Sequence, residues 1–333
     1  MLLKMCSRLC DSRRQSIRRL AIAAIALTTC LVGCASFEYL THVSDTFPQA
    51  KACGKCHIDI YEEWSQSDHA GAYTNPHFQA ATNDYAFGDC LSCHVPQARL
   101  TAGTPESRSG KREEGITCVS CHLEEGMLSG PLEPTGKVHP HPIGVRPEVY
   151  RNSDICGRCH EGTMQQWKSV ETEKNTCQEC HMESITRKVT QATGGVSNVL
   201  VAMEKEVSQR RHGFHILNDT QPPGLITLIA MRSGSTVEVR IENHLPHDLP
   251  TGDFGFRILT LEIFALDTSG NSVPIKTLEL ARELGTSIPP HGTRVWSVDV
   301  DGDVQAVRTV LTRRSYDQDT LVLARSEMGE ARR

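Results

Sequence analysis

The sequence predicts an α+β protein with two unlike domains, and three observations lead to this fold class. Cysteine pairs separated by two residues, each followed by histidine, occur five times between Cys53 and His181. Aromatic residues make up only 5% of the chain. After about residue 210, apolar and polar residues alternate as in half-buried strands. We therefore expect a mostly irregular, short-helical domain followed by an antiparallel β-sandwich of immunoglobulin-like type.

The first segment resembles an export signal. Arginines precede an apolar run over residues 20–32, which is short for a membrane span. The run ends in Leu31-Val32-Gly33-Cys34, which resembles a bacterial lipobox and predicts lipidation of Cys34. Ala35, not Asp, follows the cysteine, which favours the outer membrane over retention in the inner membrane. An uncleaved N-terminal anchor helix is the alternative.

Removal of residues 1–33 changes the net charge from −5 to −10, because that segment carries six basic residues and one acidic residue. An anionic surface argues against binding to nucleic acid or to acidic lipids. It suits a basic redox partner, although acidity can also serve solubility alone.

The five C-x-x-C-H pentapeptides predict covalent attachment of haem c. Two thiols add to the haem vinyl groups and the adjoining histidine binds the iron. Residues i, i+3 and i+4 share one face of a helical turn, so the three side chains reach one porphyrin edge. The predicted thioether residues are Cys53, Cys56, Cys90, Cys93, Cys118, Cys121, Cys156, Cys159, Cys177 and Cys180, and the proximal ligands are His57, His94, His122, His160 and His181.

Zinc ribbons and thioredoxin-like redox pairs are the alternative interpretations. Zinc takes cysteine pairs two at a time and does not require a histidine after each pair. Three other cysteines precede the expected cleavage site, and Cys34 is assigned to the lipid, so no cysteine remains for a disulfide. The sequence therefore predicts a pentahaem cytochrome c domain over residues 53–183.

This domain is too short and too poor in aromatic residues to enclose five porphyrins in an ordinary core, so the haems themselves are expected to form the core. Residues 34–52 are predicted to be a tether, and residues 184–211 a linker containing one helix. The β-sandwich is expected over residues 212–333. Its predicted strands lie at residues 236–242, 259–263, 294–300, 306–312 and 320–324, within a total of roughly seven.

Three segments also carry a family resemblance. Cys53-Gly-Lys-Cys-His57, with Trp64-Ser-Gln-Ser67-Asp-His69-Ala70 after it, resembles the opening of cytochrome c-554-like (cytochrome c-552/4) multihaem proteins. Gly115-Ile-Thr-Cys118-Val-Ser-Cys121-His122 and Cys177-Gln-Glu-Cys180-His181-Met182 resemble later sites of the family. The resemblance implies that His69 is a haem ligand. The family prototype has four haems and no β domain, and the β half resembles a companion domain of larger members.

The sixth ligand of each iron decides the function. A second histidine gives a low-spin electron carrier, whereas an open position admits a substrate. His69 is the first distal candidate, followed by His139 or His141 in a Pro-rich loop. His212 lies at the domain junction, and His247 lies in a proline-stiffened loop of the β domain. His42 is favoured for the fifth iron, with His77, His215 and His244 as substitutes.

We expect electron transfer by five haem c groups, mostly bis-histidine, in an exported, lipid-anchored protein of a respiratory or extracellular electron-transfer chain. Its expected partners are redox proteins, either other cytochromes or a membrane oxidoreductase, and no nucleotide is expected. The alternative is an oxidoreductase acting on small nitrogen or sulfur compounds at one open haem. A purely structural role in a cytochrome wire fits poorly with an anchor and a capping domain.

Overall fold

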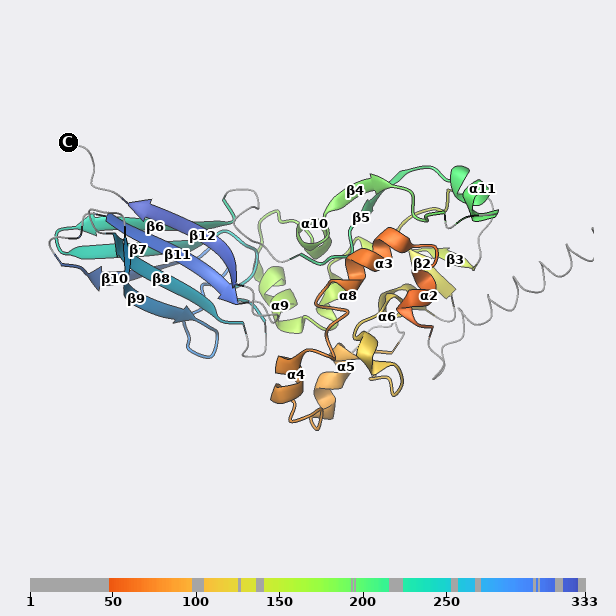
Figure 1. The fold of residues 1–333 in the computed structure, drawn as a ribbon, viewed down its shortest axis with the longest axis horizontal. Helices are drawn as coiled ribbons and strands as arrows, with labels where there is room; N and C mark the ends of the chain where they lie inside the picture. Colours follow the sequence, from red (N-terminus) through yellow and green to blue (C-terminus); the bar gives the residue numbers. More distant parts are fainter. Residues whose placement is uncertain are drawn as a thin grey trace, which may run out of the picture.

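The computed structural model places two parts side by side, a helical part and a β-sandwich (Figure 1). This arrangement confirms the predicted fold class. The described residues are 48–97, 105–124, 127–135, 141–192, 194, 196–215, 224–252, 257–266, 271–301, 304, 306–314 and 320–328.

The helical part consists of short helices and turns. Its elements are α2 (Ala50–Cys53), α3 (Ile58–Ser65), α4 (Pro76–Ala81), η1 (Gly88–Cys90), α5 (Leu91–His94), η2 (Arg112–Glu114), α6 (Cys118–His122), α7 (Pro147–Tyr150), α8 (Asp154–Gly157), α9 (Glu161–Ser169) and α10 (Cys177–His181). Local caps set several of their starts. Asn75 accepts hydrogen bonds from the backbone N–H groups of His77 and Phe78, with Pro76 at the first position of α4. Thr176 and Glu179 form a capping box at α10.

Little apolar side-chain surface is buried within the helical part. Its two clusters are Val119 and Leu123 with Leu128 against them, and Phe78, Leu91 and Val95 with partly buried neighbours. Such small clusters cannot offset the conformational entropy of ordering well over 100 residues. This agrees with the expectation that protein side chains alone do not form the core of this part.

Two small sheets in the helical part were not predicted. One contains β1 (Leu123–Glu124), β2 (Met127–Gly130) and β3 (Ile143–Val145). In the other, β4 (Ser184–Arg187) pairs antiparallel with β5 (Val207–Arg210). The expected helix of the linker occurs as α11 (Val196–Ala202), but it lies between the paired strands β4 and β5. The segment predicted as a linker with one helix therefore also contains two strands, which return the chain to the helical part.

The β-sandwich has the predicted antiparallel strands. These are β6 (Ile226–Ser233), β7 (Thr236–Asn243), β8 (Leu259–Leu266), β9 (Ser272–Leu280), β10 (Thr293–Asp299), β11 (Ala306–Arg314) and β12 (Thr320–Met328). One sheet has the order β10-β7-β6 and the other the order β12-β11-β8-β9. Strand β9 pairs with β8 and so belongs to the four-stranded sheet, not to the sheet of β10, β7 and β6. Strands β6 and β9 were not located from sequence, and Pro274 within β9 is tolerated because β9 is an edge strand.

Alternating residues of both sheets meet in a single core. Val237, Val239 and Ile241 of β7 are fully buried, as are Leu261 and Ile263 of β8. Because side chains alternate across a strand, this periodicity places one apolar face of each sheet against the other. The sandwich is the part of the chain with an ordinary hydrophobic core.

A buried asparagine shapes the loop after β7. Asn243 has no exposed surface. Its amide nitrogen donates hydrogen bonds to the carbonyls of His247, Ile288 and Pro289 at 2.9 to 3.0 Å, and its oxygen accepts one from the N–H of Leu245. Two backbone hydrogen bonds between Leu249 and Ile288 fix the other end of the loop. The loop that carries His247 is therefore held firmly against the sandwich.

Within the described ranges, no helix has the length and apolar character needed to cross a membrane. The apolar run at residues 20–32 and Cys34 lie outside those ranges.

Candidate haem-binding site

Each of the five pentapeptides forms a helical turn. The motifs at Cys118 and Cys177 coincide with α6 and α10. In the first and fourth motifs, the N–H groups of His57 and His160 donate to the carbonyls of Cys53 and Cys156, both at 3.0 Å. Two thiols and one imidazole are thereby brought to one side of each turn, as the spacing predicts. All ten motif cysteines are free of disulfides.

Four motif histidines have the same hydrogen bond. In each, the ring Nδ1–H donates a hydrogen bond to a backbone carbonyl. Because the proton is then on Nδ1, the lone pair of Nε2 is available to a metal. The pairs are His57 with Val189 (3.0 Å), His94 with Ala72 (2.7 Å), His122 with Ser129 (2.8 Å) and His181 with His215 (2.8 Å). This donor set fits a haem iron.

Three motif histidines face a second imidazole. Two imidazoles that share one metal ion through bonds of about 2 Å have ring centroids roughly 6 Å apart. The observed separations are 6.4 Å for His57 and His141, 6.2 Å for His160 and His69, and 6.1 Å for His122 and His212. The chain thus leaves room for one iron between the rings of each pair.

His69 and His212 are half-buried, and their surroundings lower the pKa of each ring. Burial, together with the nearby His160 and His94, lowers the pKa of His69 to about 3. Burial, together with the nearby His122, lowers the pKa of His212 to about 4. A low pKa keeps an imidazole neutral, and a neutral imidazole has a ring nitrogen lone pair that can bind a metal. The low pKa values therefore support a role as metal ligands rather than as surface residues.

His247 of the sandwich lies near His181 of the fifth motif. Burial is the main cause that lowers the pKa of His247, and the neighbouring His181 lowers it further. The Nδ1–H of His247 donates to the Asp248 carbonyl at 2.9 Å, which leaves Nε2 for a metal. The β half therefore contributes an imidazole to the region of the fifth motif.

The second motif is different. The ring of His94 stacks on Phe78 with centroids 3.7 Å apart and planes 6° apart. Among the described residues, Phe78 is the ring that stacks on His94, and the nearby imidazole of His69 is paired with His160 instead. The sixth position at this motif is the one for which the described chain offers no histidine.

The remaining histidine predictions divide into two groups. His42 and His139 lie outside the described residues, as does Cys34. His77 is exposed at the start of α4, and the Nε2 of His244 lies 3.0 Å from the Thr227 hydroxyl and 3.5 Å from Glu242. His215 contributes its backbone to His181. The structure does not bring these three side chains together with a motif histidine.

Several hydrogen bonds hold the segment that carries His69. The Trp64 Nε1 donates to the Ile116 carbonyl at 2.8 Å, and the Ile116 N–H donates to the His69 carbonyl at 2.9 Å. Ser67 donates its hydroxyl to the Trp64 carbonyl and accepts from Ala70. Gly115 has φ +56°, and a Cβ there would lie 2.4 Å from the His69 carbonyl oxygen. The tryptophan, serine, histidine and glycine of the sequence patterns thus belong to one local structure.

Sequence reasoning missed Glu63, whose carboxylate lies at the centre of an ionic cluster. It accepts two hydrogen bonds from Arg187, at 2.7 and 2.8 Å, and one from Arg211 at 2.8 Å. It also accepts the backbone N–H of His212 at 3.0 Å. Burial by itself would raise the pKa of Glu63, but the hydrogen bonds and positive charges of the two arginines lower it. Because the partners lie over 120 residues away in sequence, no local pattern could have revealed this contact.

Phe214 is a second residue that the sequence did not assign to the site. Its ring lies 4.2 Å from that of His69 and 6.1 Å from that of His212. It therefore fills the space between distal candidates that face two different motifs.

The motifs themselves lie close to one another. Thiols that would be thioether sulfurs in the mature protein lie close enough across motifs to alter each other's pKa. The pairs are Cys53 with Cys118, Cys93 with Cys159, and Cys156 with Cys177. Cys121 is also close enough to Cys156 and Cys159 to raise the pKa of each. The five motifs therefore form one connected group centred on the third and fourth.

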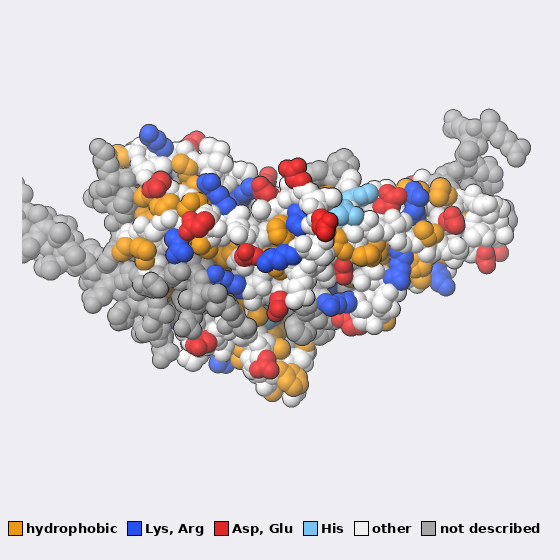
Figure 2. All heavy atoms as spheres, turned by 180° about the vertical axis from the view of Figure 1, so that it is seen from behind, with side chains coloured by type: hydrophobic (Ala, Val, Ile, Leu, Met, Phe, Trp, Pro, Cys, Tyr) orange, Lys and Arg blue, Asp and Glu red, His pale blue; other side chains and the backbone are white. Residues whose placement is uncertain are grey.

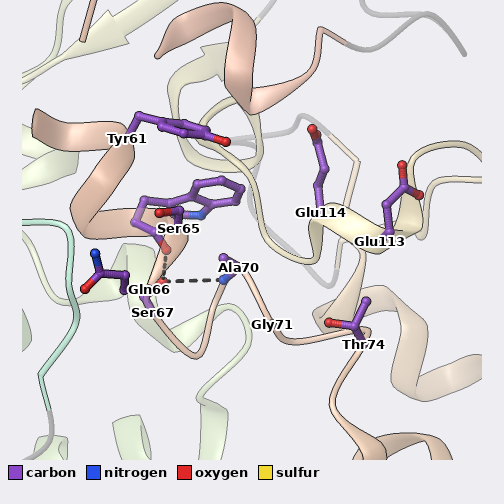
Figure 3. A pocket seen from close by; sticks show the side chains of 10 residues that line it. Tyr61, Ser65, Gln66, Ser67, Ala70, Gly71, Thr74, Glu113 and Glu114 are labelled. Atoms are coloured by element: carbon purple, nitrogen blue, oxygen red, sulfur yellow. Dashed lines mark hydrogen bonds between the residues drawn. The ribbon is translucent and has the colours of Figure 1, made fainter. Parts of the chain in front are cut away.

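A surface pocket of about 340 Å³ lies between α3 and η2 (Figure 3). Its walls include Tyr61, Trp64, Glu113 and Glu114, together with serine and threonine hydroxyls. None of the lining residues is a cysteine or histidine. The pocket is therefore separate from the histidine pairs.

A family model supplies the deciding comparison. Residues 52–123, which include the first three motifs, match the family described as cytochrome c554 and c-prime. The segment that carries these motifs is that of a multihaem c-type cytochrome. Electron transfer in general, haem c as cofactor and redox proteins as partners follow from that identity. Among the described residues, no cluster of three or more His, Cys, Asp or Glu side chains could hold a directly bound metal ion.

The fold of this chain is similar to that of a solved structure. A penta-heme cytochrome c552 from Thermochromatium tepidum is 20% identical, with a TM-score of 0.58 over 84% of this chain and 98% of that chain. This likeness shows the fold alone. A superoxide reductase from Archaeoglobus fulgidus and the hypothetical protein PH1083 from Pyrococcus horikoshii cover 31% and 32% of this cytochrome at TM-scores of 0.22 and 0.21, too low to carry an argument. No curated protein matches the chain.

Proposed function

We propose that this cytochrome binds five haem c groups, one at each C-x-x-C-H motif, and carries electrons between redox proteins. The observation that supports this most strongly is the pairing of motif histidines with second imidazoles. His57, His160 and His122 face His141, His69 and His212 at 6.1 to 6.4 Å, and His247 lies near His181. Two histidine ligands fill both axial positions and favour electron transfer over substrate binding.

The chain's own residues hold the proximal histidines in place and bring neighbouring motifs close together. Bound haem c supplies an iron that accepts and releases one electron. The carbonyls of Val189, Ser129 and His215 fix the proximal rings through Nδ1. The neighbouring motifs support a continuous route through the protein, with the first and second motifs reached through the third and fourth. No acid–base group is needed for this transfer.

The net charge of the protein supports an encounter with other proteins, but it does not mark one docking site. The net charge of −10 expected after removal of residues 1–33 would attract a basic partner. On the face shown in Figure 2, however, acidic and basic side chains are mixed rather than gathered into one patch. We infer that charge aids the encounter without defining one large docking site on that face.

A second function rests on the second motif. Because His94 has no imidazole opposite it among the described residues, the haem at Cys90 and Cys93 is the candidate for an open position. Such a haem would bind a small nitrogen or sulfur compound, as in the oxidoreductase alternative. His42, outside the described residues, is the sixth ligand that the carrier function predicts there.

A haemochrome assay combined with low-temperature EPR tests these proposals. The carrier function predicts five haems per chain and low-spin signals from all five. Fewer than five haems would contradict the proposed number. One high-spin signal that shifts with nitrite or hydroxylamine would instead favour the enzyme.

We also propose that the cytochrome is exported and held at the outer membrane by a lipid on Cys34. The apolar run and the lipobox-like sequence before Cys34 support this localisation. The wild-type protein is expected in the membrane fraction, and the Cys34→Ala variant in the soluble periplasmic fraction with its haems attached. Equal membrane retention of both proteins would contradict the lipid anchor and favour an uncleaved helix.

A further inference from the structure

Two residues of α9 bind the sandwich loop that carries His247. The Gln166 Oε1 accepts hydrogen bonds from the Asp248 N–H at 3.1 Å and from the Thr251 hydroxyl at 2.6 Å. Its Nε2 donates to the Asp248 carboxylate at 3.0 Å. One turn earlier, the Thr163 hydroxyl lies 2.9 Å from that of Thr251. Residues three apart share one face of a helix, so both side chains reach the same loop.

These hydrogen bonds act on Asp248, the residue whose backbone orients His247. The Asp248 N–H is bound by Gln166, and the Asp248 carbonyl accepts the Nδ1–H of His247. A rotation of this residue's backbone would therefore break one of the two bonds. From the other side, Asn243 holds the His247 carbonyl at 2.9 Å. The imidazole is thus fixed by contacts from both parts of the protein.

Helix α9 is itself joined directly to a haem motif. It begins at Glu161, immediately after His160, the proximal histidine of the fourth motif. In Figure 1, α9 and α10 are the labelled helices beside the sandwich. A side chain on α9 therefore connects the fourth motif to a loop that serves the fifth.

We infer that Gln166 is a positioning residue: it holds the sandwich loop so that His247 presents Nε2 to the haem of the Cys177–His181 motif. This inference rests on the proposed ligation by His247. An amide is suited to the position because it accepts two hydrogen bonds and donates one to a carboxylate. A carboxylate at position 166 could not donate to Asp248 and would place two negative charges together.

Ligand accessibility in the full-length holoprotein tests the inference. We expect Gln166→Ala to increase binding of CO by one reduced haem by about 10- to 100-fold, the usual range for removal of a residue that orients a metal ligand. The oxidised protein is expected to show a partial high-spin signal. Gln166→Glu should have the same direction of effect. Gln165→Ala is the matched control, because Gln165 is exposed and bonds to Glu161 of its own helix.

A second pair of variants removes the contact from the other side. Thr251→Val deletes the hydroxyl that binds Gln166 and should reproduce the CO binding of Gln166→Ala, whereas Thr251→Ser should retain wild-type behaviour. His247→Ala should give one full high-spin haem. If the Gln166 and Thr251→Val variants stayed fully low-spin while His247→Ala gave a high-spin haem, the positioning role of Gln166 would be overturned. Ligation by His247 would stand in that case. An unchanged spectrum in His247→Ala would overturn the proposed ligand and the inference with it.

Discussion

Without haem attachment, the chain is expected to lose the structure of residues 48–215 and to keep the β-sandwich. Among the described residues, the sandwich buries 17 apolar residues in one cluster, whereas the two clusters of the helical part contain two and three. At roughly 1.5–3 kcal/mol for each large side chain fully buried, only the sandwich can offset its loss of conformational entropy from protein atoms alone. Porphyrin surface must supply the rest in the helical part.

Limited proteolysis of protein made with and without the haem attachment machinery measures this difference. The haem-free chain should yield a resistant fragment that begins near residue 224 and includes the strands β6 to β12. The holoprotein should resist cleavage over both parts. Equal resistance of residues 48–215 in the two forms would show that the helical part folds without its haems.

Two substitutions provide controls for the sandwich. Asn243→Ala removes the four hydrogen bonds of a buried amide, and the His247 carbonyl loses its Asn243 donor while the Ile288 and Pro289 carbonyls keep backbone donors, so the free energy of unfolding should fall by roughly 2–4 kcal/mol. The resistant fragment should then become sensitive to protease. Ser297→Ala, at an exposed position of β10, should leave it unchanged.

Replacement of His69 by alanine is expected to convert one haem of the five to the high-spin form. The ring of His69 faces that of His160 at 6.2 Å, so water or a small ligand would replace it at one iron. His69→Met should keep that haem low-spin and raise its reduction potential, because methionine ligation favours the reduced iron. EPR with a redox titration separates the two variants.

His77→Ala is the matched control for His69. His77 is an exposed histidine of the same part of the chain, and the structure gives it no motif histidine as a partner. All haem signals should be unchanged in this variant. If His69→Ala and His77→Ala both retained the wild-type spectra, His69 would be a structural residue of the segment after Trp64.

The local sequence determined the haem motifs and the strands. A C-x-x-C-H turn depends on residues within one turn of helix, and the alternation in β7 and β8 depends on neighbours two positions apart, so both can be read without the fold. His69 could also be named from the sequence, because Trp64, Ser67 and Gly115 lie in segments that resemble the family pattern. The choice between His139 and His141 was left open by the sequence, and the ring pair of His57 with His141 supports the second as a proposal.

Tertiary structure decided which distant residues meet. The return of the chain through β4 and β5 brings Arg187 and Arg211 to Glu63, and the docking of the sandwich brings Asp248 and Thr251 to Gln166. These contacts join segments more than 80 residues apart and involve residue types that are usually solvated on a surface. The sequence by itself determined that this protein carries haem c on a chain with a β-sandwich. Only the fold decided which histidines face one another, because that depends on long-range packing and not on spacing along the chain.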